Sequence, residues 1–341
     1  MTNVRSNEKP RVLVTLSPLP DLREAIAGAL EGVAAITYLP EVGEDERASA
    51  LASADAVLAW LPSELHGPEE AALLESAGLF QSMAAGVDQV PFDQLPGRVA
   101  VASNAGAYAD PMAEHVLAMA LALAKRLPQN HAAMAQGVFD RQTPTHAIRG
   151  AVVGILGFGG IGQSAGRLFR TLGARVHAVN TSGRTTEPVE WVGTLRELDA
   201  VLAAADVLVV SLPLTRATDG LIGAPELSLM KSDAILVNVA RGAIVDEDAL
   251  YEHLRGNPSF SAGIDAWWEE PDSLESFAPG RPFFELPNVL GSPHNSANTG
   301  NALAVAGRRA AENISRYLRG EPVLHLVDRS AYVAQLGPHH G

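Results

Sequence analysis

The sequence predicts an α/β protein built from two doubly wound domains, each with a parallel sheet. Its 341 residues are enough for two domains of about 150 to 200 residues each. Short β-branched runs alternate with helical patterns in both halves, which is typical of a parallel sheet covered by helices. A glycine-rich turn of the kind that opens such a domain begins only at Gly157. Another domain therefore precedes it.

The first half contains five short apolar runs that we interpret as strands, at 11–16, 34–39, 56–61, 80–83 and 99–102. Helical patterns separate them at 21–30 and 44–51. A longer Ala/Leu/Met helix is expected over 110–125, with Asp110 as its N-cap and Pro111 in its first turn.

The alternation starts again after residue 150. Further strands are predicted at 151–156, 175–179, 207–211, 234–239, 261–265 and 289–291. A helix over 302–319 and the segment 322–327 close the chain. We expect residues 105–296 to form one domain, and residues 1–104 and 297–341 to form the other, because the chain returns to its first domain at the end.

Composition excludes several classes of partner. Hydrophobic residues make up 47% of the chain and charged residues 19%, with a formal net charge of −14. This acidic balance argues against nucleic acid or an anionic membrane surface as a partner. The absence of cysteine excludes thiol chemistry and suits the cytoplasm. Residues 1–10 lack the apolar stretch of a signal peptide, and the apolar run 116–124 is too short to span a bilayer, so we expect a cytoplasmic protein.

The turn at residue 157 has the spacing of a dinucleotide-binding fingerprint, Gly157-x-Gly159-x-x-Gly162. A predicted strand runs into it and an amphipathic run, 163–172, follows it. In this pattern the first glycine permits a tight turn, the second lets a pyrophosphate approach the backbone, and the third lets the helix pack on the strand. The residues expected to bind the cofactor are Gly157, Phe158, Gly159, Gly160, Ile161 and Gly162. The alternative is a glycine-rich turn without a ligand.

Three polar residues follow successive strands of the second half: Arg241, Glu270 and His294. The carboxyl ends of parallel strands line the ligand crevice of an open sheet. A histidine that donates a proton, a carboxylate that holds it and an arginine that grips a carboxylate are what reduction of a 2-keto acid requires. The alternatives are a salt-bridged surface arginine and a capped loop histidine. No metal site is expected, and the pair His339-His340 is interpreted as part of a loose tail.

Several blocks in order resemble the D-2-hydroxyacid dehydrogenase family over nearly the whole chain, especially its glyoxylate and hydroxypyruvate reductases. The matching blocks are 154–162, SLPLT at 211–215, MKSDAILVNVARG at 230–242, DAWWEEP at 265–271, SPH at 292–294 and AGVD at 85–88. The resemblance implies a Rossmann cofactor domain inserted in a flavodoxin-like substrate domain. It also implies a homodimer that uses the long helix after Asp110.

The resemblance also assigns roles. Arg241 would bind and polarise the substrate, His294 would be the acid/base, and Glu270 would orient it, with the adjacent Glu269 as the alternative. Asp265 would contact the nicotinamide carboxamide, and Pro213 would lie at the cofactor. The backbone amides of Ala85, Gly86 and Val87 would bind the substrate carboxylate.

The cofactor preference is predicted from the end of the second strand of this domain. NAD-selective folds usually carry Asp or Glu there to hold the ribose 2′-hydroxyl, whereas this chain has Asn180. Ser182 and Arg184 follow and could bind a 2′-phosphate. We therefore expect NADP, with NAD as the alternative and with Arg184 stacked on the adenine in that case.

The substrate class is a small 2-keto or 2-hydroxy acid, with glyoxylate or hydroxypyruvate favoured. Glu270 argues against formate oxidation, since the formate-oxidising relatives have glutamine there. The sequence leaves open whether Trp267 and Trp268 line the pocket or fill the core. The alternative function is a dinucleotide-sensing scaffold of the corepressor type, without significant turnover.

Overall fold

The computed structural model describes residues 9–60, 64–271 and 276–332, and these form two compact units. The first unit comprises Met1–Ala107 and Thr299–Gly341, and the second comprises Tyr108–Asn298. The boundaries expected from the sequence, 104/105 and 296/297, fall within three residues of these crossings. His339-His340 lies outside the described residues.

The first unit contains a five-stranded parallel sheet with strand order β2-β1-β3-β4-β5, which is the flavodoxin-like order. Its strands are β1 (Arg11–Val14), β2 (Ala35–Tyr38), β3 (Ala56–Ala59), β4 (Leu79–Ser82) and β5 (Ala100–Ala102). Each overlaps a predicted apolar run. Strands β3 and β4 are buried at every residue, and such strands read as continuous apolar segments, whereas the edge strand β2 is buried only at Tyr38.

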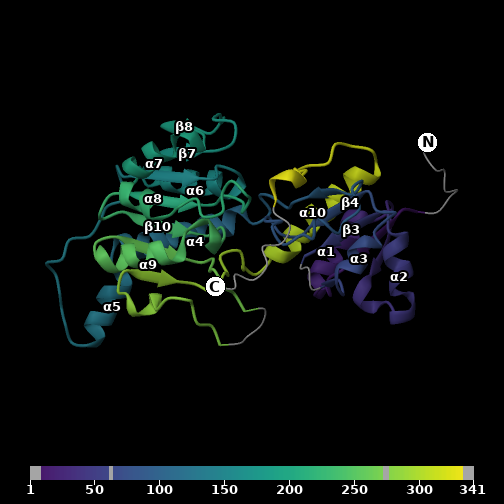
Figure 1. Cartoon of the computed structure of the whole chain (residues 1–341), viewed down its shortest axis with the longest axis horizontal. Helices are drawn as coiled ribbons and strands as arrows, with labels where there is room; N and C mark the ends of the chain where they lie inside the picture. The colour runs from purple at the N-terminus through teal and green to yellow at the C-terminus, as the bar shows by residue number, and fades with distance from the viewer. Residues whose placement is uncertain (1–8, 61–63, 272–275, 333–341) are drawn as a thin grey trace. The chain divides into compact units, whose positions relative to one another are not determined.

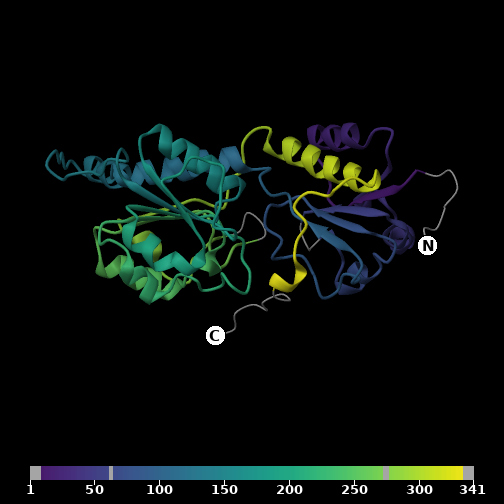
Figure 2. The ribbon, with the colours of Figure 1, turned by 90° about the horizontal axis from the view of Figure 1, so that it is seen from above.

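Helices cover both faces of this sheet. They are α1 (Pro20–Leu30), α2 (Glu44–Ser53), α3 (Pro68–Ala72) and α10 (Ala302–Leu318), with short 3₁₀ turns η1 (Leu39–Glu41) and η6 (Arg329–Ala331). Figure 2 shows α1 and α10 side by side on one face. At Gly307 of α10 a Cβ would lie 2.1 Å from a methyl carbon of Leu22, so the two helices approach closely. Beyond α10, Leu326 pairs with Ala102 in an antiparallel bridge on the edge strand β5.

The second unit contains a seven-stranded parallel sheet with strand order β12-β11-β10-β9-β6-β7-β8. Numbered from β6, this is the Rossmann order 3-2-1-4-5-6 with one further strand. The strands are β6 (Val152–Leu156), β7 (Arg175–Val179), β8 (Trp191–Gly193), β9 (Val207–Val210), β10 (Ile235–Asn238), β11 (Ser261–Ile264) and β12 (Val289–Gly291). The short edge strand β8 is the one that the sequence pattern did not predict.

Two layers of helices cover this sheet, with α4 and α6 on one face and α7, α8 and α9 on the other (Figures 1 and 2). The elements are α4 (Ala109–Ala124), α5 (Leu127–Ala135), α6 (Gly160–Thr171), η3 (Leu195–Glu197), α7 (Leu198–Ala204), α8 (Ala224–Leu229), η4 (Gly242–Ile244), α9 (Glu247–Gly256) and η5 (Phe283–Glu285). No helix in the described ranges is long and apolar enough to cross a membrane.

The expected N-cap of α4 is wrong. The helix begins at Ala109 with Tyr108 as its N-cap residue, so Asp110 lies inside the first turn. There its carboxylate accepts a hydrogen bond from the hydroxyl of Ser164 in α6 at 2.8 Å. Asp110 therefore joins two helices on the same face of the sheet.

Candidate active site

The fingerprint turn connects β6 to α6, and its glycines serve different physical needs. Gly157 has φ +94°, and a Cβ there would lie 2.5 Å from the backbone oxygen of Ser211. A Cβ at Gly162 would lie 2.3 Å from the backbone oxygen of Gly157. Both contacts are with backbone atoms, which a side-chain rotation cannot relieve. These two positions require glycine for the fold itself.

Gly159 differs, because a Cβ there would meet no atom within 4 Å. It precedes the first residue of α6, and no side chain caps that helix. Uncapped N–H groups and the helix dipole favour an anion at such a terminus. Open space, a missing cap and backbone N–H groups fit the pyrophosphate of a dinucleotide. Phe158 is buried and packs against Gly166, so its side chain belongs to the core.

Asn180 follows β7 and organises the loop that carries Ser182 and Arg184. Its side-chain oxygen accepts hydrogen bonds from the N–H groups of Ser182 at 3.1 Å and Gly183 at 2.7 Å. Its amide donates to the backbone oxygen of Arg184 at 2.8 Å. Within the described residues, the exposed guanidinium of Arg184 makes no ion pair. The loop therefore presents a cation. The side chain of Asn180 and the hydroxyl of Ser182 are both engaged within the loop, where the Ser182 hydroxyl lies 3.2 Å from Oδ1 of Asn180 and from the carbonyl oxygen of Arg184.

The segment after β9 lies against the fingerprint turn. The hydroxyl of Ser211 donates to the backbone oxygens of Gly157 at 3.0 Å and Leu156 at 3.2 Å. The carbonyl of Pro213 accepts a hydrogen bond from the buried hydroxyl of Thr218 at 2.7 Å. These bonds fix the backbone of the segment next to the turn.

Parallel register places the remaining residues along the same edge of the sheet. Asn238 of β10 is paired with Ile264 of β11, which is paired with Gly291 of β12. The three strands therefore end at one level, and neighbouring strand ends are about 4.8 Å apart. Arg241, Glu270 and His294 follow these three ends. The sequence prediction that the three lie at one sheet edge agrees with this register.

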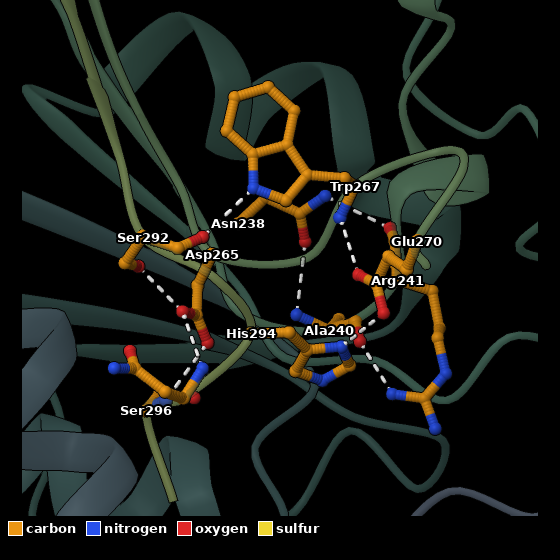
Figure 3. Close-up of polar contacts among 10 residues, drawn as sticks. Asn238, Ala240, Arg241, Asp265, Trp267, Glu270, Ser292, His294 and Ser296 are labelled. Carbon is orange, nitrogen blue, oxygen red and sulfur yellow. Dashed lines mark hydrogen bonds and ion pairs between the residues drawn. The ribbon is translucent and has the colours of Figure 1, made fainter. Parts of the chain in front are cut away.

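Glu270 and His294 form a direct pair. Oε2 of Glu270 lies 2.7 Å from Nδ1 of His294, and Oε1 accepts the N–H of Trp267 at 2.8 Å (Figure 3). Nε2 of His294 makes no hydrogen bond within the described residues of this unit, and the side chain is 34% exposed. The ring is thus held on one nitrogen and open on the other.

The adjacent Glu269 is not the partner of His294. It faces the start of α9, close to Glu247. The pKa of Glu247 is raised mainly by burial, and the nearby charges of Asp248 and Glu269 raise it further. Of the two carboxylates, Glu270 is the one that contacts His294 in the structure, and its orienting role stays a prediction.

Arg241 lies in the loop after β10, whose shape Asn238 determines. The amide of Asn238 donates to the backbone oxygen of Arg241 at 2.9 Å, and its side-chain oxygen accepts the N–H of Ala240 at 3.0 Å. One guanidinium nitrogen of Arg241 donates to the Ala240 carbonyl at 2.7 Å (Figure 3). A Cβ at Gly242 would lie 2.4 Å from the backbone of Trp267, so this loop packs tightly against the loop after β11.

Asp265 is fully buried, with both carboxylate oxygens in use. Oδ1 accepts the hydroxyl of Ser292 at 2.5 Å and the N–H of Asn295 at 3.1 Å, and Oδ2 accepts the N–H of Ser296 at 3.2 Å (Figure 3). Oδ2 could accept a further hydrogen bond, but the side chain is 0% exposed in this structure, so a nicotinamide carboxamide has no open path to it here. The predicted contact with the cofactor therefore stays a prediction. What the structure shows is an anchor for the loop that carries His294.

His115 belongs to this anchor and was not predicted as a site residue. Its Nε2 lies 2.9 Å from the hydroxyl of Ser292 and 3.7 Å from Oδ1 of Asp265. The sequence pattern places it on an apolar helix, where a packing role is the ordinary interpretation. No local signal pointed to the contact, because Ser292 is 177 residues away in the chain.

The two tryptophans fill the core. Trp267 is buried and Trp268 stacks on Phe283 with ring centroids 5.3 Å apart. The indole N–H of Trp267 donates to the carbonyl of Ser292 at 2.9 Å, and that of Trp268 donates to the carbonyl of Val245 at 2.6 Å. Trp267 thereby links the loop of Glu270 to the loop of His294.

The predicted carboxylate-binding loop follows β4 in the first unit. The side-chain amide of Asn104 donates to the carbonyl of Met83 at 3.0 Å, and its backbone N–H donates to the carbonyl of Ala84 at 2.9 Å. The backbone N–H groups of residues 85–87 donate no hydrogen bond within the described part of this unit. Their role at a substrate stays a prediction. The described residues contain no cluster of ligands suited to a metal ion.

An open parallel sheet with a fingerprint turn at its centre and a histidine–carboxylate pair at its edge defines a dinucleotide-binding oxidoreductase fold. Residues 117–296 match the family model of the D-isomer specific 2-hydroxyacid dehydrogenase NAD binding domain. The chain belongs to this family, and its second unit is the nicotinamide-dinucleotide-binding domain.

Relatives with several names match the chain. A D-3-phosphoglycerate dehydrogenase of Archaeoglobus fulgidus is 34% identical over 71% of this chain and 46% of its own length. The chain thus spans about half the length of that relative. A glyoxylate reductase of Aeropyrum pernix is 30% identical over 94% of this chain and 97% of its own. A D-isomer specific 2-hydroxyacid dehydrogenase of Xanthobacter autotrophicus, solved with NADPH and MES, superposes with a TM-score of 0.75 at 29% identity, covering 94% of this chain and 98% of that one.

Proposed function

We propose that this protein reduces a small 2-keto acid with a nicotinamide dinucleotide, using His294 as the acid. The observation that carries the proposal is the 2.7 Å contact between Nδ1 of His294 and Glu270 at the carboxyl edge of the sheet. With Nδ1 held by the carboxylate, Nε2 is the atom that can give a proton to a carbonyl oxygen or take one back from a hydroxyl. By holding Nδ1, Glu270 fixes the orientation of the ring.

Arg241 is proposed to bind the substrate. A guanidinium matches a carboxylate in two parallel hydrogen bonds and also withdraws electron density from an adjacent carbonyl. The side chain of Asn238 holds the backbone of Arg241, so the position of the Arg241 Cα is fixed. We propose the N–H groups of Ala85, Gly86 and Val87 as further donors to the substrate carboxylate.

The residues at the fingerprint turn fit a dinucleotide. Gly159 leaves open space before an uncapped helix, and backbone N–H groups there would hold the pyrophosphate. Pro213, on the neighbouring strand end, is proposed to border it. When bound, the reduced nicotinamide supplies the hydride that reduces the carbonyl carbon.

NADP is the proposed form of the cofactor. The support is the absence of a carboxylate at Asn180 and the presence of the exposed Arg184 and Ser182 in the same loop. A carboxylate would repel a 2′-phosphate, whereas a guanidinium stabilises it. The Ser182 hydroxyl would exchange its bond within the loop for one to the phosphate. The relative from Xanthobacter autotrophicus was solved with NADPH, which is consistent with this choice.

Glyoxylate or hydroxypyruvate is the proposed substrate, and the Aeropyrum pernix relative is named a glyoxylate reductase. The test is the initial rate of loss of the reduced-nicotinamide absorbance, with NADPH and NADH separately, over a panel from glyoxylate to phenylpyruvate. We expect turnover of the small acids with NADPH preferred, and its loss in His294→Gln and Arg241→Ala with cofactor affinity retained. Full turnover by Arg241→Ala would refute its role. Tight cofactor binding without turnover of any acid would refute the reductase.

A homodimer is proposed on the exposed apolar arm after α4. Helix α5 buries none of its residues in the unit, and Leu127, Met134 and Phe139 are 56%, 60% and 72% exposed. Large apolar side chains exposed within one short segment support an interface there. We expect a dimeric mass by light scattering, and a monomeric mass for Met134→Glu combined with Phe139→Glu.

A further inference from the structure

His115 contacts the candidate active site without being part of the reacting set. It lies on α4, which packs against β10 and β11, and its ring is half-buried. Its Nε2 lies 2.9 Å from the hydroxyl oxygen of Ser292, two residues before His294. The direction of this hydrogen bond decides what His115 can do.

The hydrogens in the cluster determine that direction. The hydroxyl of Ser292 has one hydrogen, and it is donated to Oδ1 of Asp265 at 2.5 Å. Ser292 must therefore accept in its contact with His115, so Nε2 of His115 carries a hydrogen. The result is a chain of two hydrogen bonds, in which His115 donates to Ser292 and Ser292 donates to Asp265. An acceptor at position 115 would compete with Asp265 for the serine hydrogen.

This series of hydrogen bonds from His115 to Asp265 ends at the backbone segment that carries His294. The carboxylate of Asp265 also accepts hydrogen bonds from the N–H groups of Asn295 and Ser296. The backbone carbonyl of Asp265 accepts one from the N–H of His294 at 2.9 Å. His294 has φ +48°, in the left-handed region. A non-glycine residue keeps such a conformation only where surrounding contacts impose it. The hydrogen bonds around Asp265 are these contacts.

We propose that His115 is a positioning residue for His294. By donating to Ser292 it orients the serine hydroxyl toward Asp265, and Asp265 in turn holds residues 294–296 so that Nδ1 of His294 meets Glu270. The inference rests on the proposed function, in which His294 transfers the proton. His115 itself touches neither substrate nor cofactor in this proposal.

Three variants test the proposal. His115→Phe keeps an aromatic ring and removes the donor, and Ser292→Ala removes the middle of the chain. His115→Gln places an amide donor near the position of Nε2. We expect His115→Phe to lower kcat on the order of tenfold, the rate equivalent of one lost hydrogen bond, with the Kd for NADPH unchanged. His115→Gln should restore most of kcat.

The double variant His115→Phe with Ser292→Ala should be no slower than Ser292→Ala alone, since both changes interrupt one chain of donors. Wild-type kcat in His115→Phe would overturn the proposal. Equal losses of kcat and Tm in His115→Phe and His115→Gln would also overturn it, because the ring would then act by packing.

A measurement without turnover separates this proposal from the proposed function. In protein labelled with ¹⁵N-histidine, the ring signals of His294 are assigned by their loss in His294→Gln. His115→Phe should shift the Nδ1 signal that reports the contact with Glu270, and His115→Gln should leave it in place. An unshifted signal in His115→Phe would refute positioning even if no keto acid is reduced. A shifted signal in a protein without turnover would refute the reductase alone.

Discussion

Oε2 of Glu270 lies 2.7 Å from Nδ1 of His294, while Oε1 of the same carboxylate accepts the backbone N–H of Trp267. The carboxylate thus bridges its own loop and the ring. A glutamine has one acceptor oxygen where the glutamate has two, so it cannot accept from both Nδ1 of His294 and the N–H of Trp267.

The first prediction concerns this pair. Glu270→Gln should lower kcat for keto-acid reduction by about 10²-fold, at the lower end of what acid–base catalysis contributes. The Kd for the cofactor should not change. Glu269→Gln is the matched control, because its side chain is exposed and makes no contact with His294. A similar loss of kcat in both variants would contradict the assignment.

The second prediction separates two kinds of glycine in the fingerprint turn. Gly162→Ala places a methyl group 2.3 Å from a backbone oxygen, so it should lower the free energy of unfolding by about 1 to 3 kcal/mol. Gly159→Ala meets no atom within 4 Å and should change that free energy by less than about 0.5 kcal/mol.

The affinity for the cofactor should show the reverse contrast. In Gly159→Ala the new methyl group occupies space proposed for the pyrophosphate, so the Kd should rise by at least about tenfold. Denaturant titration and fluorescence titration with NADPH measure the two quantities. An unchanged Kd in Gly159→Ala would show that the pyrophosphate binds elsewhere.

Strand ends are what the sequence predicted well. Arg241, Glu270 and His294 each follow an apolar run, and parallel strands bring such ends to one edge regardless of the intervening helices. The edge strand β8 was missed although β5 and β12, which are equally short, were predicted. Its residues Trp191, Val192 and Gly193 lie between Glu190 and Thr194, so the sequence shows no continuous apolar run there.

Contacts between distant residues could not be predicted in the same way. His115 reaches Ser292 only because α4 packs on β10 and β11, which no local pattern encodes. From the sequence, Asn180 was interpreted only as a position that lacks the carboxylate usual in NAD-selective folds. Its side chain makes four hydrogen bonds within its own loop, and these depend on the geometry of that loop.

The third prediction concerns cofactor preference. Arg184→Ala should raise the KM for NADPH by about ten- to hundredfold, the equivalent of a lost charged hydrogen bond, and leave the KM for NADH nearly unchanged. Arg255→Ala, which removes an exposed arginine paired with Glu252 on α9, is the control. Equal effects on both cofactors would favour adenine stacking instead. Asn180→Asp is a poorer test, because its carboxylate would face the carbonyl of Arg184.

The fourth prediction concerns the stability of the first unit. Arg47 and Glu70 are 7% and 9% exposed, and Nε and Nη2 of the arginine contact the two carboxylate oxygens at 2.6 and 2.9 Å. Removing one member of a buried pair leaves the other charge without compensation. Glu70→Gln should therefore lower the free energy of unfolding by about 3 to 5 kcal/mol. Glu69→Gln, an exposed neighbour, should have little effect.

The pH dependence of this contribution follows from the pKa of Glu70. Burial acts to raise that pKa, but the hydrogen bonds from Arg47 and from the N–H of His66 outweigh it, so the pKa is lowered from 4.5. A carboxyl whose pKa is lower in the folded state stabilises the fold above its unfolded pKa, and that stabilisation is lost as pH falls through the folded pKa. The difference in unfolding free energy between wild type and Glu70→Gln should be constant near neutral pH and shrink below about pH 4.5. Denaturant titrations of both proteins across this range measure it, and a difference that grew on acidification would show that Arg47 is not the partner that matters.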